Sequence, residues 1–187
     1  LHKFLSGKRL GDKRIELFLT GKDDPESLPN IIFNVTLKDL SDIRQYVPIL
    51  LDMGYDPKNI HITWVLQKFE VAVQQNKSRS RTVPEPIVFR SHEGAFETMY
   101  PILQGAIPAG VNGSITIILN AFEHTVWYAD ANGERIKNSL GQTQVKSFSY
   151  VTVKQPGRMM DPESAAVAKV VGWILDAVPR TASVPTS

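Results

Sequence analysis

The sequence has no cysteine, which excludes disulfide bonds, thiol catalysis and thiolate metal sites. Its four histidines lack the spacing of metal ligands, so we expect no metal held by protein side chains alone. No apolar run approaches the roughly 18 residues of a membrane span, and no signal peptide is visible. An excess of one charge is also missing, because the formal net charge is only +2. We therefore expect a cytoplasmic protein with no membrane partner.

Strand-like apolar runs alternate with helical stripes, which indicates an α/β fold with one sizeable core. The pattern predicts buried strands at 30–35, 60–65 and 114–120, and helices at 40–51, 69–75 and 85–103. Since a helix separates the first two strands, residues 30–65 predict a βαβ unit with parallel strands and a right-handed crossover. Pro48 should kink or divide the first of these helices.

The remaining chain predicts shorter elements. Residues 125–129 and the Asn132-Gly133 dipeptide predict a hairpin, and residues 148–154 alternate like a further strand. Asp161 followed by Pro162 is typical of a helix N-terminus. The stripe of that helix consists of Val167, Val170, Val171, Ile174, Leu175 and Val178. Residues 1–22 predict one or two helices broken by glycines.

The stretch 76–84 contains three cations in five positions, Lys77, Arg79 and Arg81, and ends at Pro84. It lies between two predicted helices and follows a predicted strand. Guanidinium groups bind phosphate oxygens through a planar fork of donors. A flexible basic segment in this position is typical of the lid of a phosphoryl-transfer enzyme. The alternative interpretation is a solvated basic surface.

Three blocks of sequence carry a family resemblance. They are Ile31–Lys38, then Gly54-Tyr55 with 60–65 and 69–72, then Arg79–Pro84 with Ser91-His92. In this order and spacing they resemble the zeta-toxin family of P-loop kinases, in its bacteriophage form. The resemblance covers a little over a third of the chain.

The resemblance implies a P-loop NTPase-like fold, with parallel strands between two layers of helices. It also implies ATP and Mg²⁺ as cofactors, a nucleotide partner, and the cytoplasm of a bacterial host or a phage-infected cell. The implied lid residues are Lys77, Arg79 and Arg81, with Arg79 and Arg81 catalytic at the γ-phosphate, and the implied acceptor-side residues are Asn34, Thr36 and Lys38. Asn34 stands where the family usually has a glutamate that holds a sugar nucleotide. The acceptor, whether nucleotide, sugar nucleotide or nucleic-acid base, therefore stays open.

The sequence departs from the family in one motif. A P-loop requires Gly-x-x-x-x-Gly-Lys-Ser/Thr, and neither Ser6-Gly-Lys8 nor Thr20-Gly-Lys22 has that spacing. The catalytic acid that normally follows the loop is missing with it. One expectation is that Leu1 begins inside a longer polypeptide, so that an upstream segment or a second chain completes the fold. The other is a degenerate domain that never had the loop.

On the first expectation, residues 1–104 are the lid-containing part of the kinase core. Residues 105–180 extend the same domain with strands and a closing helix, and residues 181–187 form a disordered tail.

Two functions follow from these patterns. The first is an ATP-dependent phosphotransferase, and the second is a non-catalytic α/β module that binds an anionic ligand, nucleic acid or protein partner through the same cations. Asp39 beside Ser41 is interpreted as a helix cap, not as a general base. His92 lies on the apolar stripe of the helix 85–103 and is interpreted as a hydrogen-bonded core residue.

Overall fold

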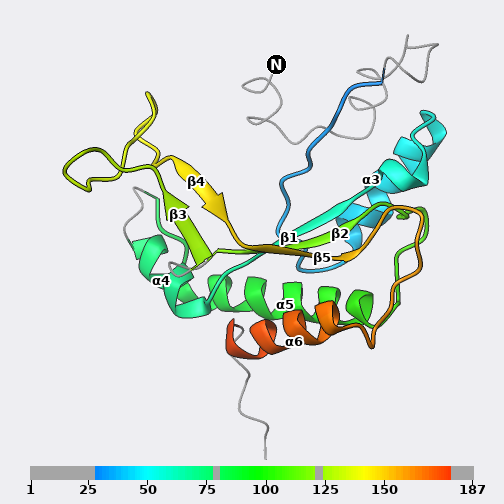
Figure 1. The fold of residues 1–187 in the computed structure, drawn as a ribbon. Helices are drawn as coiled ribbons and strands as arrows, with labels where there is room; N and C mark the ends of the chain where they lie inside the picture. The colour runs from blue at the N-terminus through cyan, green and yellow to red at the C-terminus, as the bar shows by residue number, and fades with distance from the viewer. Residues whose placement is uncertain (1–27, 78–80, 121–123, 178–187) are drawn as a thin grey trace, which may run out of the picture.

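Three strands form the main sheet of this mixed α/β protein, whose computed structural model describes residues 28–77, 81–120 and 124–177. Strands β1 (Ile62–Leu66), β2 (Ile115–Leu119) and β5 (Tyr150–Lys154) lie in the order β1-β2-β5. β1 is parallel to β2, and β5 is antiparallel to β2 (Figure 1). The α-helices are α3 (Ser41–Asp52), α4 (Phe69–Lys77), α5 (Glu85–Leu103) and α6 (Ala165–Ala177), and a short 3-10 helix, η2, spans Pro57–Asn59.

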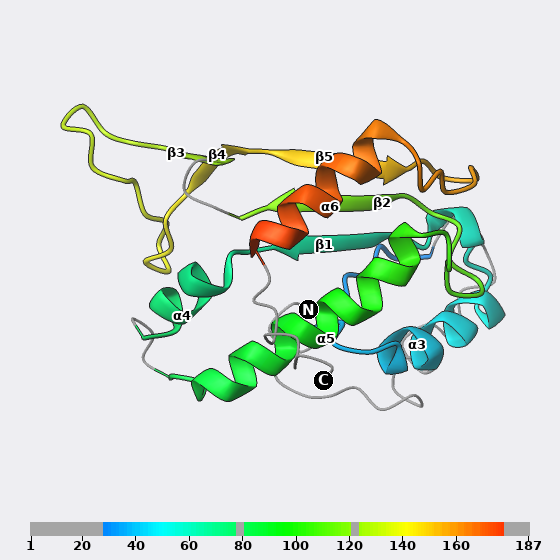
Figure 2. The ribbon, with the colours of Figure 1, turned by 90° about the horizontal axis from the view of Figure 1, so that it is seen from below.

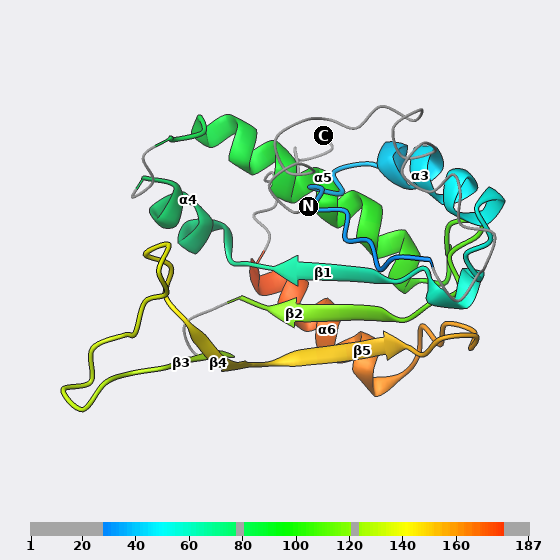
Figure 3. The ribbon, with the colours of Figure 1, turned by 90° about the horizontal axis from the view of Figure 1, so that it is seen from above.

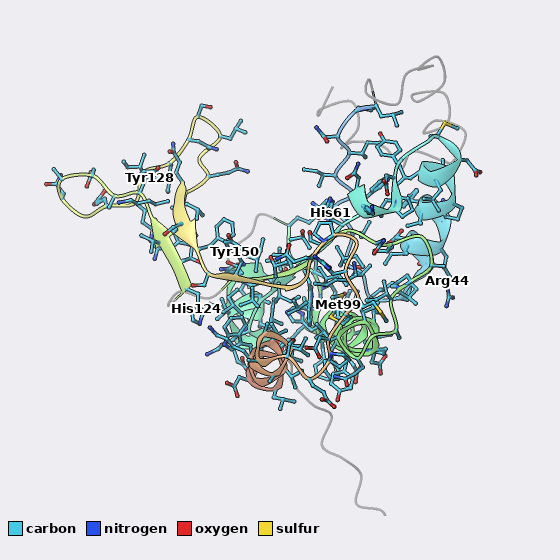
Figure 4. The ribbon with its side chains drawn as sticks, turned by 45° about the vertical axis from the view of Figure 1, so that its right-hand side comes forward. Arg44, His61, Met99, His124, Tyr128 and Tyr150 are labelled. Atoms are coloured by element: carbon cyan, nitrogen blue, oxygen red, sulfur yellow. The ribbon has the colours of Figure 1, made fainter. Side chains whose placement is uncertain are left out.

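Alternation along the strands decides which face of the sheet is buried. In β1, Ile62, Trp64 and Leu66 are buried, whereas Thr63 and Val65 are exposed. Helices α5 and α6 cover the buried face (Figure 2), and Met99 of α5 is fully buried in the core between them and the sheet (Figure 4). In the view of Figure 3, no described element lies over the opposite face. The sheet with α5 and α6 thus forms two layers, and α3 lies beside the sheet, beyond its β1 edge (Figure 3).

The crossover that joins the two parallel strands is helical. The chain leaves β1, forms α4 and α5, and returns to start β2. The helix at 85–103 and the strands at 60–65 and 114–120 are confirmed to within two residues at each end. α3 is also confirmed, and it continues through Pro48 without division.

The predicted strand at 30–35 is wrong, and with it the predicted βαβ unit over residues 30–65. Residues 30–35 have no strand pairing, although their burial alternates: Ile31 and Phe33 are partly buried and Ile32 is 93% exposed. Phe33 stacks on Tyr46 of α3, with ring centroids 4.7 Å apart. The apolar side chains of this segment therefore pack on a helix, while its backbone stays outside the sheet.

A projecting ribbon follows β2, and we call residues 125–148 the β arm. Its two strands, β3 (Thr125–Trp127) and β4 (Val145–Phe148), are antiparallel. A turn at Gly133 confirms the hairpin predicted from Asn132-Gly133, and a second turn follows at Gly141. The arm extends away from the helices (Figure 1). The strand predicted at 148–154 is confirmed as β5, with a break at Ser149 that separates it from β4.

The start of α6 differs from its prediction. Ser164 precedes the helix and its hydroxyl accepts a hydrogen bond from the Val167 amide at 3.3 Å, so Ser164 is the N-cap. Asp161 instead closes the preceding turn, where its carboxylate accepts from the Glu163 amide at 3.1 Å. Leu175, predicted to face the core, is 47% exposed. None of the helices in the described ranges is both long and apolar enough to cross a membrane.

Candidate functional site

The basic segment that the sequence singles out follows α4, and α4 begins at an edge where two parallel strands end. β1 stops at Leu66, and α4 starts three residues later. β2 ends beside it, since the Asn120 amide donates to the Leu66 carbonyl at 2.8 Å. In open α/β sheets, ligands bind outside the carboxyl ends of the strands. The start of α4 therefore lies at the edge where a ligand site is expected, and the basic segment follows at the other end of this helix.

Asn76 closes the base of this loop. It is the buried residue of α4, and its side-chain amide both donates a hydrogen bond to the backbone of Val83 and accepts one from it. Asn76 Nδ2 donates to the Val83 carbonyl at 2.6 Å, and Asn76 Oδ1 accepts from the Val83 amide at 2.9 Å. The two bonds join the end of α4 to the approach to α5. We call residues 77–82, which they enclose, the basic loop.

Aromatic contacts join α4 and α5, the two helices on either side of the basic loop. Phe69 at the start of α4 meets Phe89 and His92 of α5 edge to face, each with centroids 5.7 Å apart. His92 Nδ1 lies 3.0 Å from the Val88 carbonyl. That contact confirms the hydrogen bond expected for His92, but its side chain is only half-buried and does not belong to the core.

The basic loop presents its described cations to solvent. Lys77 and Arg81 are exposed, and within the described ranges neither pairs with a carboxylate. Lys77 occupies the last turn of α4, where the carbonyl end of the helix favours a positive charge. Arg79 lies outside the described residues. The exposed ammonium and guanidinium groups are available to bind an anion.

The predicted acceptor-side residues Asn34, Thr36 and Lys38 belong to the segment 28–38, which runs between α3 and α5. Tyr55 anchors its start by donating its hydroxyl to the Pro29 carbonyl at 2.6 Å. Burial raises the pKa of Tyr55, so this donor keeps its proton. All three of the predicted residues are exposed.

The end of this segment presses on α5 at a glycine. A Cβ placed on Gly94 would lie 2.6 Å from the Lys38 carbonyl oxygen, so only glycine permits the approach. The neighbouring Leu37 has a φ of 50°, in the left-handed region that non-glycine residues seldom adopt. Such backbone conformations persist only where the surrounding structure imposes them. The position of Lys38 is thus set by the helix behind it.

Asp39 follows Lys38 and lies two residues before the start of α3. Its carboxylate accepts hydrogen bonds from the hydroxyl and, at 2.8 Å, from the amide of Ser41. These two bonds, the hydroxyl first, hold the pKa of Asp39 below its usual value. Leu40 occupies the N-cap position without a side-chain bond, so Asp39 satisfies the first turn from one residue further out. Asp39 is thus not the N-cap residue that the sequence predicts, although its carboxylate does bond the first amide of α3.

The structure does not bring the basic loop close to the predicted acceptor-side residues. The basic loop precedes α5, whereas Lys38 contacts this helix at Gly94. Glu85 at the start of α5 follows the basic loop, and Gly94, which touches Lys38, lies nine residues further along the helix. At a rise of about 1.5 Å per residue this separates the groups by about 14 Å along the axis. A ligand that contacted both would have to be elongated.

Two residues that position this site could not be recognised from the sequence. Asn76 and Gly94 carry no recognisable motif, and only the structure shows that one closes the basic loop and the other receives Lys38. An asparagine at the end of a predicted helix, before a basic run, is the one available signal for Asn76.

The described residues fit only one side of an ATP site. Lys77 and Arg81 suit phosphate oxygens, but no group of three His, Asp or Glu side chains in the described ranges is placed to hold a metal ion. Mg²⁺ is therefore assigned no ligand in this part of the chain.

No protein-family model, curated protein or solved structure matches the chain.

Proposed function

We propose that this chain provides the lid and the acceptor side of an ATP-dependent phosphotransferase of the zeta-toxin-like P-loop class. The observation that carries the proposal is the basic loop, which Asn76 closes at the C-terminal end of α4, the helix that follows β1. In phosphoryl transfer the protein acts mainly by positioning and by neutralising charge on the transferring group. Cations on a closed loop between two packed helices can supply that charge.

In this proposal each cation has a defined role. Arg81, with Arg79, binds the γ-phosphate oxygens through its guanidinium fork, and Lys77 adds a further positive charge. Asn34, Thr36 and Lys38, about 14 Å further along α5, bind the distal part of an elongated acceptor whose hydroxyl reaches the γ-phosphate. When bound, ATP supplies the phosphoryl group.

A P-loop-type three-layer fold needs further elements next to this sheet. β1 is an edge strand with a partner on one side only among the described residues, and Val65 on the uncovered face is 53% exposed. These two surfaces can accept a strand and a covering layer. The proposal assigns them to the nucleotide-gripping part, from the same polypeptide or a second chain.

The test replaces Arg81 with alanine in the protein as its source makes it, with Arg90→Ala as the matched control. Both arginines are exposed, but Arg90 lies within α5, outside the basic loop. If Arg81 neutralises the transferring group, turnover of ATP with the acceptor falls by about 10³-fold or more. Arg90→Ala should leave turnover within a factor of a few. Turnover of Arg81→Ala near that of the unaltered protein would overturn the proposal.

A non-catalytic anion-binding module is the second candidate, and the same exposed cations favour it. It predicts binding of a polyanion that weakens steeply with added salt and does not depend on ATP. An assay of anion binding with and without ATP, over a range of salt concentrations, separates the two functions.

A further inference from the structure

An aromatic hollow lies at the junction of the β arm, the main sheet and α6, away from the basic loop. Its volume is about 420 Å³, within the usual range of small-molecule pockets. Its lining residues are His124, Phe148, Ser149, Tyr150, Lys169 and Trp173. β5 and β1 are the two edge strands of the sheet. The hollow lies at the β5 edge, and the basic loop follows the strand at the other edge, β1. His124 and Tyr150 mark the end of the sheet from which the arm projects (Figure 4).

Aromatic rings dominate the lining. The rings of His124 and Trp173 have centroids 6.1 Å apart, as do those of Phe148 and Tyr150. Tyr150 is 61% exposed, an unusual state for a large ring beside a core strand. Lys169 covers one face of the Trp173 ring, so the exposed Tyr150 ring is the surface onto which a further flat ring can stack.

The polar groups of the hollow suit an anion. Lys169 Nζ lies 5.0 Å above the centre of the Trp173 ring, and no carboxylate is among the lining residues. The backbone of Ser149 is held on both sides, since its amide donates to the His124 carbonyl and its carbonyl accepts from the Leu119 amide, each at 2.9 Å. Its hydroxyl has no hydrogen-bond partner within the described ranges. The site therefore combines stacking surfaces, one cation and one available hydroxyl on a fixed backbone.

We propose that this hollow binds a nucleotide unit, with the base stacked on Tyr150 next to Trp173 and the phosphate at Lys169. Every nucleobase has a flat π face, and stacking on aromatic side chains beside cations is how proteins hold single nucleotides or unpaired strands. The ligand is either a free mononucleotide or one residue of a single strand, and both present this chemistry. The assignment does not depend on phosphoryl transfer at the basic loop.

The experiment measures binding of AMP, UMP and single-stranded oligonucleotides of about eight residues to the full chain by calorimetry at low salt. Trp173→Ala and Tyr150→Ala are each expected to weaken binding by about tenfold, the usual effect of losing one stacking partner. Tyr150 is largely exposed, so its replacement keeps the test valid if Trp173→Ala fails to fold. Equal affinity for mononucleotide and strand identifies a free nucleotide, and much tighter binding of the strand identifies nucleic acid.

Charge is tested with a matched pair. Lys169→Gln should weaken binding and flatten its salt dependence, whereas Lys58→Gln, which removes the same charge from η2, should change neither. Arg81→Ala should also leave this binding intact, which separates it from the proposed function. The assignment is overturned if none of the nucleotides binds at millimolar concentration. It is equally overturned if binding survives Trp173→Ala and Tyr150→Ala but is lost in Arg81→Ala.

Discussion

Asp39 should make the stability of the protein depend on pH. Its folded-state pKa is lowered by the Ser41 hydroxyl and amide, so the carboxylate form stabilises the fold. This contribution is present above the unfolded pKa and is lost as the pH falls through the folded pKa. Asp39→Ala is therefore expected to unfold at lower urea concentration at pH 7, with a difference that shrinks as the solution is acidified.

Asp52→Ala is the control, because Asp52 is an exposed carboxylate at the opposite end of the same helix. A negative charge there opposes the helix dipole, so its removal should not destabilise the protein at pH 7. A pH-independent loss of stability in Asp39→Ala would show that its hydrogen bonds to Ser41 are not the cause.

Single residues also show how much of the candidate site the sequence could predict. Charge made Lys77 and Arg81 visible, since clustered cations are recognisable without coordinates. Asn76 was not predictable, because its role depends on Val83 being brought back to within 2.9 Å. Lys154 is a similar case: its ammonium is buried and bonds the Gly113 carbonyl at 2.8 Å, whereas a lysine at the end of a predicted strand is expected in solvent.

At the scale of elements, the extended segment 28–38 shows where periodicity stops being informative. The apolar run at residues 30–35 predicted a buried strand, but its burial alternates, and an apolar run identifies an extended chain and not its partner. Tyr46 and Tyr55 attract the segment to α3 and the loop after it, and neither contact leaves a sequence signature. α5 was predictable in full because its stripe is long and Pro84 precedes it.

The contact of the segment 28–38 with α5 leads to a prediction about two glycines. Gly94→Ala should destabilise the protein by about 1–3 kcal/mol, because its Cβ would collide with the Lys38 carbonyl, a backbone atom. Gly172→Ala in α6 is the matched control: a Cβ there meets nothing within 4 Å. The gain in helix propensity should then stabilise the protein by up to about 1 kcal/mol. Urea unfolding of both variants measures the difference, and a stabilised Gly94→Ala would mean that Lys38 is not seated on α5.

For the whole molecule, the sequence predicted the class of fold but not its connections. An α/β arrangement with parallel strands was predicted and is present, yet β1 pairs with β2 instead of with residues 30–35. Pairing partners far apart in sequence are chosen by the packing of the complete core, and local patterns carry little information about that choice. The same holds for the aromatic hollow, whose residues come from three separate parts of the chain.

The β arm is expected to be dispensable for the stability of the whole molecule. Its residues from 128 to 142 are all exposed, and the Arg135 guanidinium, 4.8 Å above the Trp127 ring, contacts another residue of the arm, an interaction worth about 0.5–1 kcal/mol. Tyr128 and Gln144 are already neighbours, because the Tyr128 amide donates to the Gln144 carbonyl at 3.0 Å. An Asn-Gly turn can therefore replace residues 129–143 between them.

The shortened protein should unfold cooperatively, with a midpoint within about 5 °C of the full chain, as followed by circular dichroism. It should also keep the proposed nucleotide binding, since every residue that lines the hollow lies outside the deleted segment. Loss of cooperative unfolding would show that the arm stabilises the sheet from which it projects. If the fold is unchanged but strands bind more weakly while mononucleotides bind equally well, the arm must itself contact the nucleic acid beyond the hollow.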